Sequence, residues 1–101
     1  MTVLIGSWEF EGPFTQSRDL LHEPGIYAIL SCTDNEYELL EIDETESVRA
    51  TLEKHDRYPL GKPTSATNVA AAVYYCADLT AALREGLIEE VLKEFNAEVA
   101  C

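Results

Sequence analysis

Basic residues are scarce in this 101-residue chain, in which seven lysines and arginines stand against nineteen aspartates and glutamates, for a net charge of −12. Proteins that bind nucleic acid gain affinity by pairing Lys and Arg with phosphates, so this charge disfavours nucleic-acid binding. Seven acids and no basic residue lie between positions 34 and 46. This acidity either serves solubility alone or favours a basic protein partner, a bound metal ion or mimicry of nucleic acid.

Long apolar runs and cysteine pairs are also missing. No stretch of about 18 apolar residues occurs, which predicts no membrane-spanning helix, and the opening residues carry no basic leader, which predicts no signal peptide. Cys32, Cys76 and Cys101 lie far apart without a C-x-x-C pair. An odd number of such cysteines favours free thiols in a reducing cytoplasm and offers no recognisable zinc site. We therefore expect a cytoplasmic protein.

Glycine and proline divide the first third of the chain. Residues 2–10 predict a strand with an irregularity at Gly6, ended by Gly12-Pro13. Residues 15–23 predict one or two helical turns. The β-rich segments 25–32 and 36–43 then predict a hairpin, because a short polar turn joins them.

The second half alternates helix and strand. Residues 43–56 predict a helix capped by Thr45, with Val48 and Leu52 on its apolar stripe. A loop over 57–68 precedes an apolar strand at 69–77 that is buried on both faces. The last predicted helix, 79–95, has an apolar stripe that consists of Leu79, Leu83, Leu87, Val91 and Phe95, widened by Ala82, Ile88 and Leu92. The order predicts an α+β domain, a small, mostly antiparallel sheet of three to four strands flanked by helices.

One motif adds to this outline. Gly25-Ile26-Tyr27 opens the hairpin, and a helix ending at His55, a strand and a helix containing Glu89 follow. In this order and spacing the chain resembles the GIY-YIG nuclease family over residues 23–96. The resemblance implies a single domain, 1–101, in which residues 1–22 are an N-terminal addition to a GIY-YIG-like core.

The departures from the family pattern fall on its second motif and its arginine. Aligned on His55, the chain has Glu41-Ile42-Asp43 in place of Tyr-Ile-Gly, and Thr51 in place of the arginine. A shifted alignment on residues 39–41 brings Arg49 into the arginine position but moves His55 out of line. In the first alignment Arg49 points away from the site, and a basic side chain from elsewhere, Lys54 or Arg84, would be needed.

The resemblance also implies a chemistry. The family hydrolyses phosphodiesters with one divalent metal held by a glutamate, a tyrosine that helps to activate water and an arginine that stabilises charge at phosphorus. Tyr27, His55 and Glu89 are the candidate catalytic residues, and Glu89 with Glu41 or Asp43 is the candidate site for Mg²⁺ or Mn²⁺. The transition state of phosphodiester hydrolysis needs positive groups near the phosphoryl oxygens. The aligned residues of this chain lack the arginine that supplies one.

Three functions follow as hypotheses. The first is a degenerate, catalytically inactive domain that acts as a protein-interaction module, through a basic partner or through a homodimer formed by the N-terminal strand. The second is a weak metal-dependent endonuclease of GIY-YIG type. The third is an acidic mimic of nucleic acid that binds a basic protein.

Overall fold

The computed structural model describes residues 2–33, 36–55, 60, 63–64 and 67–93. Within them, one antiparallel sheet has the strand order β1-β2-β6-β3-β4, with β5 paired to β6. The strands are β1 (Thr2–Ile5), β2 (Trp8–Phe14), β3 (Gly25–Thr33), β4 (Glu36–Thr45), β5 (Pro63–Thr64) and β6 (Thr67–Tyr75). The helices are α1 (Val48–Glu53) and α2 (Ala81–Lys93). The predicted α+β class is confirmed, although the described sheet has six strands, two of them from the N-terminal segment and one the two-residue β5.

The N-terminal segment forms a hairpin where the sequence predicts one strand. Gly6 takes a positive φ of 64°, which suits the tight turn between β1 and β2. The prediction that Gly12-Pro13 ends the strand is wrong, because β2 continues to Phe14. Gly12 has a φ of 130°, and a Cβ there would lie 2.8 Å from the carbonyl oxygen of Ala71. Glycine thus lets β2 pass close to β6 where their register shifts.

Where the sequence predicts one or two helical turns at 15–23, a single 3₁₀ turn, Ser17–Asp19, forms. The carbonyl groups that would continue a helix accept hydrogen bonds from elsewhere. The amide of Val48 donates to the carbonyl of Glu23 at 3.0 Å, and that of Arg49 donates to Leu21 at 3.1 Å. The first amides of a helix have no hydrogen-bond partner within the helix. The carbonyls of Leu21 and Glu23 therefore supply partners for the first amides of α1.

Helix α1 is shorter than predicted, because residues 43–45 extend β4 instead. Its N-cap is Ser47 rather than Thr45, and the Ser47 side chain accepts a hydrogen bond from the amide of Ala50 at 3.4 Å. Val48 and Leu52 are buried, as the apolar stripe predicts.

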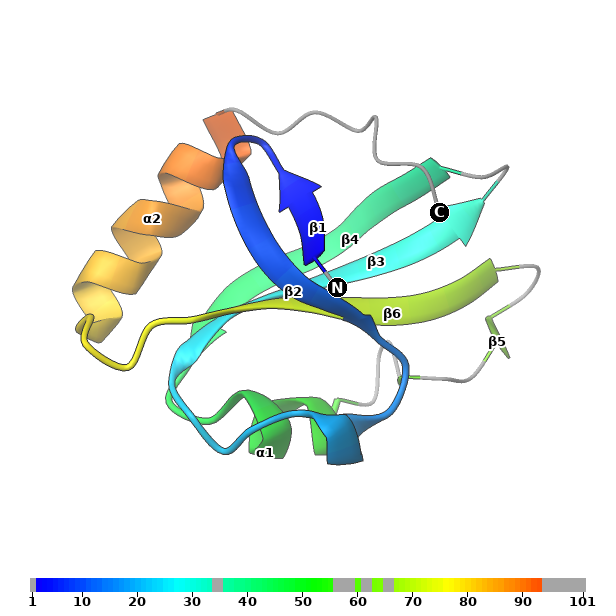
Figure 1. The fold of residues 1–101 in the computed structure, drawn as a ribbon, viewed down its shortest axis with the longest axis horizontal. Helices are drawn as coiled ribbons and strands as arrows, with labels where there is room; N and C mark the ends of the chain where they lie inside the picture. The colour runs from blue at the N-terminus through cyan, green and yellow to red at the C-terminus, as the bar shows by residue number, and fades with distance from the viewer. Residues whose placement is uncertain (1, 34–35, 56–59, 61–62, 65–66, 94–101) are drawn as a thin grey trace.

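The two helices lie on opposite sides of the sheet (Figure 1), and a separate core forms under each. The core on the α1 face contains Leu20, Tyr27, Ile29, Val48, Leu52, Val69, Ala71 and Val73. The core on the α2 face contains Val3, Ile5, Phe10, Ile26, Ala28, Leu30, Ala72, Cys76 and Val91. Residues of β1 and β2 therefore share a core with β3, and Trp8 packs against it as a partly buried side chain.

The central strand β6 is buried on both faces, as predicted, since its alternate residues enter the two cores. Tyr74 packs on the α2 face and Tyr75 on the α1 face, which confirms that these adjacent rings form no common platform. Beside them, a Cβ at Gly25 would lie 2.7 Å from the carbonyl oxygen of Tyr74. The glycine that opens the GIY motif is therefore required by the close approach of β3 and β6.

Helix α2 buries only part of the predicted stripe. Leu83 and Leu92 are 57% and 47% exposed, whereas Arg84 is only 1% exposed. Leu87, Ile88 and Val91 face the core, in line with the prediction, while Phe95 lies outside the described residues. The apolar residues alone do not locate the buried face of α2, because the charged side chain of Arg84 lies at the centre of that face.

The two cysteines in the described part of the chain differ, and Cys101 lies outside it. Cys76 is a free, buried thiol, as predicted, and burial raises its pKa. Cys32 is disulfide-bonded, so the expectation of three free thiols is wrong. The argument from free thiols to a reducing cytoplasm therefore fails. Neither helix of the described part of the chain is long and apolar enough to cross a membrane.

Candidate functional site

Strands β3 and β4 and helix α1 bring part of the predicted motif to the α1 face, while Ile26 and Ile42 face the core on the α2 side. Tyr27 lies directly opposite Asp43 in the β3–β4 ladder, and Ile29 lies opposite Glu41. Residues directly opposite each other project from the same face of a sheet, so Glu41 and Asp43 stand on the face of Tyr27. His55 lies immediately beyond the C-terminal end of α1, above that face.

Glu41 is the centre of this group. Its Oε2 accepts a hydrogen bond from the Tyr27 hydroxyl at 3.2 Å and lies 2.7 Å from Nε2 of His55. The rings of Tyr27 and His55 meet edge to face, with centroids 6.4 Å apart. The Tyr27 side chain is buried, while the Glu41 side chain is 29% exposed. We call Tyr27, Glu41 and His55 the carboxylate triad.

The environment of Tyr27 holds its hydroxyl in the neutral form. Burial raises the pKa of Tyr27, and the negative charge of Glu41 and the hydrogen bond to Glu41 raise it further. Asp43 and Glu44 add smaller contributions in the same direction. A phenol with a raised pKa is a poor base at neutral pH, so Tyr27 is not set up to accept a proton from water.

The position aligned with the family's arginine holds a satisfied neutral side chain. The hydroxyls of Thr51 and Thr45 share a hydrogen bond of 2.6 Å. The Thr45 hydroxyl also accepts from the amide of Ser47 at 3.1 Å. Thr51 thus helps to fix the turn from β4 into α1, and its short side chain brings no charge to the carboxylate triad.

None of the basic residues considered as a substitute meets the carboxylate triad. Arg49 pairs with Glu53 along α1 at 2.8 Å, which agrees with its predicted direction away from the site. Lys54 is exposed at the end of α1. Arg84 is engaged on the α2 face, with Nε 2.9 Å from Glu44 and an Nη atom 2.6 Å from Glu46.

The Arg84 group is a second polar centre, which the sequence patterns do not predict. Besides its two carboxylate partners, Arg84 donates to the carbonyl of Leu79 at 2.7 Å. The hydrogen bond to Glu44 is the main cause that raises the Arg84 pKa. We call Arg84, Glu44 and Glu46 the arginine cluster. A charged residue amid the apolar positions of α2 was the one available signal for it.

Glu89 does not join the other candidate residues. It is exposed on α2, and α2 packs on the opposite side of the sheet from Tyr27 and His55 (Figure 1). Within the described residues, no group of three or more His, Cys, Asp or Glu side chains is arranged to hold a metal ion. The structure therefore does not assemble the expected Mg²⁺ or Mn²⁺ site from Glu89 with Glu41 or Asp43.

The α1 face thus presents the carboxylates of Glu41 and Asp43 beside Tyr27 and His55. Among the described residues, His55 is the only basic side chain that contacts Glu41, and neither lysine nor arginine pairs with Glu41 or Asp43. Such a surface attracts cationic groups and repels phosphate. Comparisons with models of protein families, with curated proteins and with solved structures give no match.

Proposed function

We propose that this chain is a non-catalytic domain of GIY-YIG type that binds a basic protein partner. The single observation that carries the proposal is the position of Glu41, whose carboxylate bonds both Tyr27 and His55. In the family to which the resemblance points, this part of the site serves an anionic substrate. Here the central group of the site is itself negatively charged.

The argument against catalysis is electrostatic. Phosphoryl transfer spreads negative charge over the phosphoryl oxygens, and preorganised cations must stabilise it. Removing one such contact typically costs about 10²–10³ in rate. The described residues supply Thr51 in place of an arginine, keep Glu89 on the other side of the sheet and add a carboxylate. Each of these changes opposes the same step.

The relation to the GIY-YIG family is supported by placement rather than by sequence matches. Tyr27 is the third residue of the hairpin, Thr51 and His55 follow in and just after α1, and the side chains of Tyr27 and His55 meet through Glu41. Under this proposal residues 23–96 are the core. Strands β1 and β2 are the addition, and they extend the core's sheet through β6.

A cleavage assay tests the catalytic half of the proposal. Plasmid and single-stranded DNA would be incubated with an excess of the protein and millimolar Mg²⁺ or Mn²⁺. We expect no cleavage above that of a metal-only blank. Metal-dependent cleavage that is lost in both Tyr27→Phe and Glu89→Ala would overturn the proposal and restore the endonuclease hypothesis.

A capture experiment tests the binding half. The immobilised protein would be compared with a Glu38→Lys/Asp43→Lys variant, which reverses two exposed charges, and with a Glu85→Lys/Glu89→Lys control on α2. We expect a basic protein to be retained by the wild type and the control but not by the first variant. Its purified form should then bind less tightly as salt rises. Equal retention by all three proteins would contradict the proposal.

A further inference from the structure

Strand β4 forms one edge of the sheet. It pairs with β3 along its length, and no other strand in the described part of the chain pairs with it. An edge strand leaves alternate backbone N–H and C=O groups without a strand partner. An extended peptide can pair with such groups and add a strand to the sheet. At ten residues, β4 offers a much longer edge than the four-residue β1 at the other side.

A register shift places three carboxylates of β4 on one face. Glu38 lies opposite Ser31, and the pairing then shifts between Ile29 and Leu30. In a regular strand, residues 38 and 41 would project to opposite faces, because side chains alternate. The shift instead brings Glu38 to the α1 face, where Glu41 and Asp43 already project. The simple alternation of side chains along the sequence would not predict that Glu38, Glu41 and Asp43 share a face.

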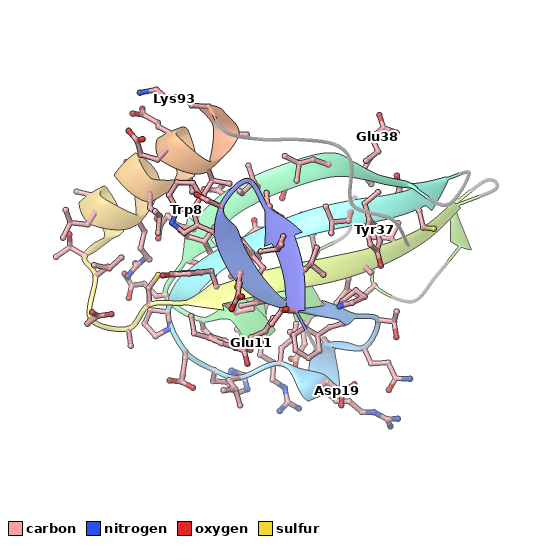
Figure 2. All side chains as sticks on the ribbon, turned by 45° about the horizontal axis from the view of Figure 1, so that its top comes forward. Trp8, Glu11, Asp19, Tyr37, Glu38 and Lys93 are labelled. Carbon is pink, nitrogen blue, oxygen red and sulfur yellow. The ribbon has the colours of Figure 1, made fainter. Side chains whose placement is uncertain are left out.

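These three carboxylates, which we call the acidic row, are open to solvent to different degrees. Glu38 and Asp43 are exposed, and Glu41 is partly exposed. Figure 2 shows the Glu38 side chain projecting away from the sheet beside β4. No lysine or arginine of the described residues forms an ion pair with the acidic row.

The other face of β4 has a different character. Tyr37, Leu39 and Ile42 pack there against the core on the α2 face. A strand added to β4 would therefore meet acidic side chains on one face and the apolar side chains of residues 37–42 on the other, where Glu44 follows them and pairs with Arg84. Lys or Arg at alternate positions would project to the α1 face, next to the acidic row. Opposite charges on neighbouring strands stabilise such pairing.

We propose that β4 is a docking edge, at which an extended segment of a basic partner protein adds as an antiparallel or parallel strand. Alternate Lys or Arg side chains of that segment pair with Glu38, Glu41 and Asp43, and the intervening side chains cover the apolar face. This inference rests on the proposed function, because it names the surface and the partner chemistry for the same module.

Charges on an edge strand also prevent aggregation, and the test must separate that role from docking. The probe is a nine-residue peptide in which Lys and Thr alternate, with a peptide of alternating Glu and Thr as its control. Backbone amide spectra and amide hydrogen exchange of the full chain would be recorded with each peptide. We expect the lysine peptide to shift and protect amides along β4, while those of β1 stay unchanged.

Two variants with the same change in charge provide the decisive comparison. In Glu38→Lys/Asp43→Lys the lysine peptide should bind roughly tenfold more weakly, because two attractive contacts become repulsive. In Glu85→Lys/Glu89→Lys, on α2, its affinity should change much less. Equal losses in both variants, no new protection along β4, or protection along β1 instead would overturn the docking edge. A partner that binds the wild type without protecting β4 would leave the proposed function standing and defeat this inference alone.

Discussion

Strand β4 supplies carboxylates to both faces of the sheet, and these carboxylates have different partners on the two faces. On the α2 face, Glu44 meets the buried Arg84, which also binds Glu46. On the α1 face, Glu41 meets Tyr27 and His55, and Asp43 is exposed without a lysine or arginine partner among the described residues. The acids therefore form two sets: Glu44 and Glu46 share a buried arginine, whereas Glu41 and Asp43 have no lysine or arginine partner among the described residues.

The largest expected effect belongs to the arginine cluster. Arg84→Met keeps the length of the side chain but leaves Glu44 and Glu46 without their cation, and breaking a buried charge pair is strongly destabilising. We expect the melting temperature to fall by roughly 10–20 °C. Thermal unfolding followed by circular dichroism measures it. Arg49→Met is the matched control, since its exposed pair with Glu53 should change the melting temperature by about 2 °C at most.

A second pair of variants compares the two faces directly. Glu44→Gln leaves Arg84 with a single carboxylate and should lower the melting temperature by roughly 5–10 °C. Glu41→Gln can still accept the hydrogen bond from Tyr27, so it should lower the melting temperature by about 4 °C or less. Equal losses in the two variants would show that the α1-face carboxylate is as structural as the α2-face one.

High pH gives a smaller effect that is specific to the α1 face. Folding raises the pKa of Tyr27 above its ordinary value of 10.0, mainly through burial. The folded protein therefore keeps this proton at a pH where the unfolded chain has lost it. The contribution to stability is full below pH 10 and declines as the pH rises beyond it.

The wild type should accordingly lose stability more steeply than Tyr27→Phe between pH 10 and about 11.5, by a few degrees in melting temperature. Tyr75→Phe serves as a second reference, because burial raises the pKa of Tyr75 as well, while its hydroxyl bonds the backbone of Leu21 instead of a carboxylate. Parallel profiles for the wild type and Tyr27→Phe would show that folding does not raise the pKa of Tyr27 in solution.

Much of the fold follows from local patterns. The hairpin, the doubly buried strand before α2 and the Val48/Leu52 stripe all depend on apolar periodicity, and the structure has them. The errors arise where tertiary contacts decide. The segment 15–23 continues no further than one 3₁₀ turn because its later carbonyls accept hydrogen bonds from α1, and β2 passes through Gly12-Pro13 because glycine permits close contact with β6.

The candidate site was predictable in part for the same reason. Spacing along one hairpin and one helix was enough to bring Tyr27, Glu41 and His55 to one face. Spacing along the sequence does not place Glu89. The side of the sheet that α2 covers depends on long-range packing between α2 and the core. The position of Glu38 depends on a register shift between two strands, which no single-strand pattern reveals.

The central claim is that, among the described residues, Glu41 and Asp43 on the α1 face lack the arginine partner that Glu44 has in Arg84 on the α2 face. Its most direct test is to add one, by comparing the melting temperatures of Thr51→Arg and Thr51→Met, which have side chains of similar reach. We predict that the arginine variant melts roughly 2–4 °C higher at low salt and that the gap closes at high salt. We also predict that the gap shrinks in a Glu41→Gln background. An arginine variant that is no more stable than the methionine variant at low salt would contradict the account.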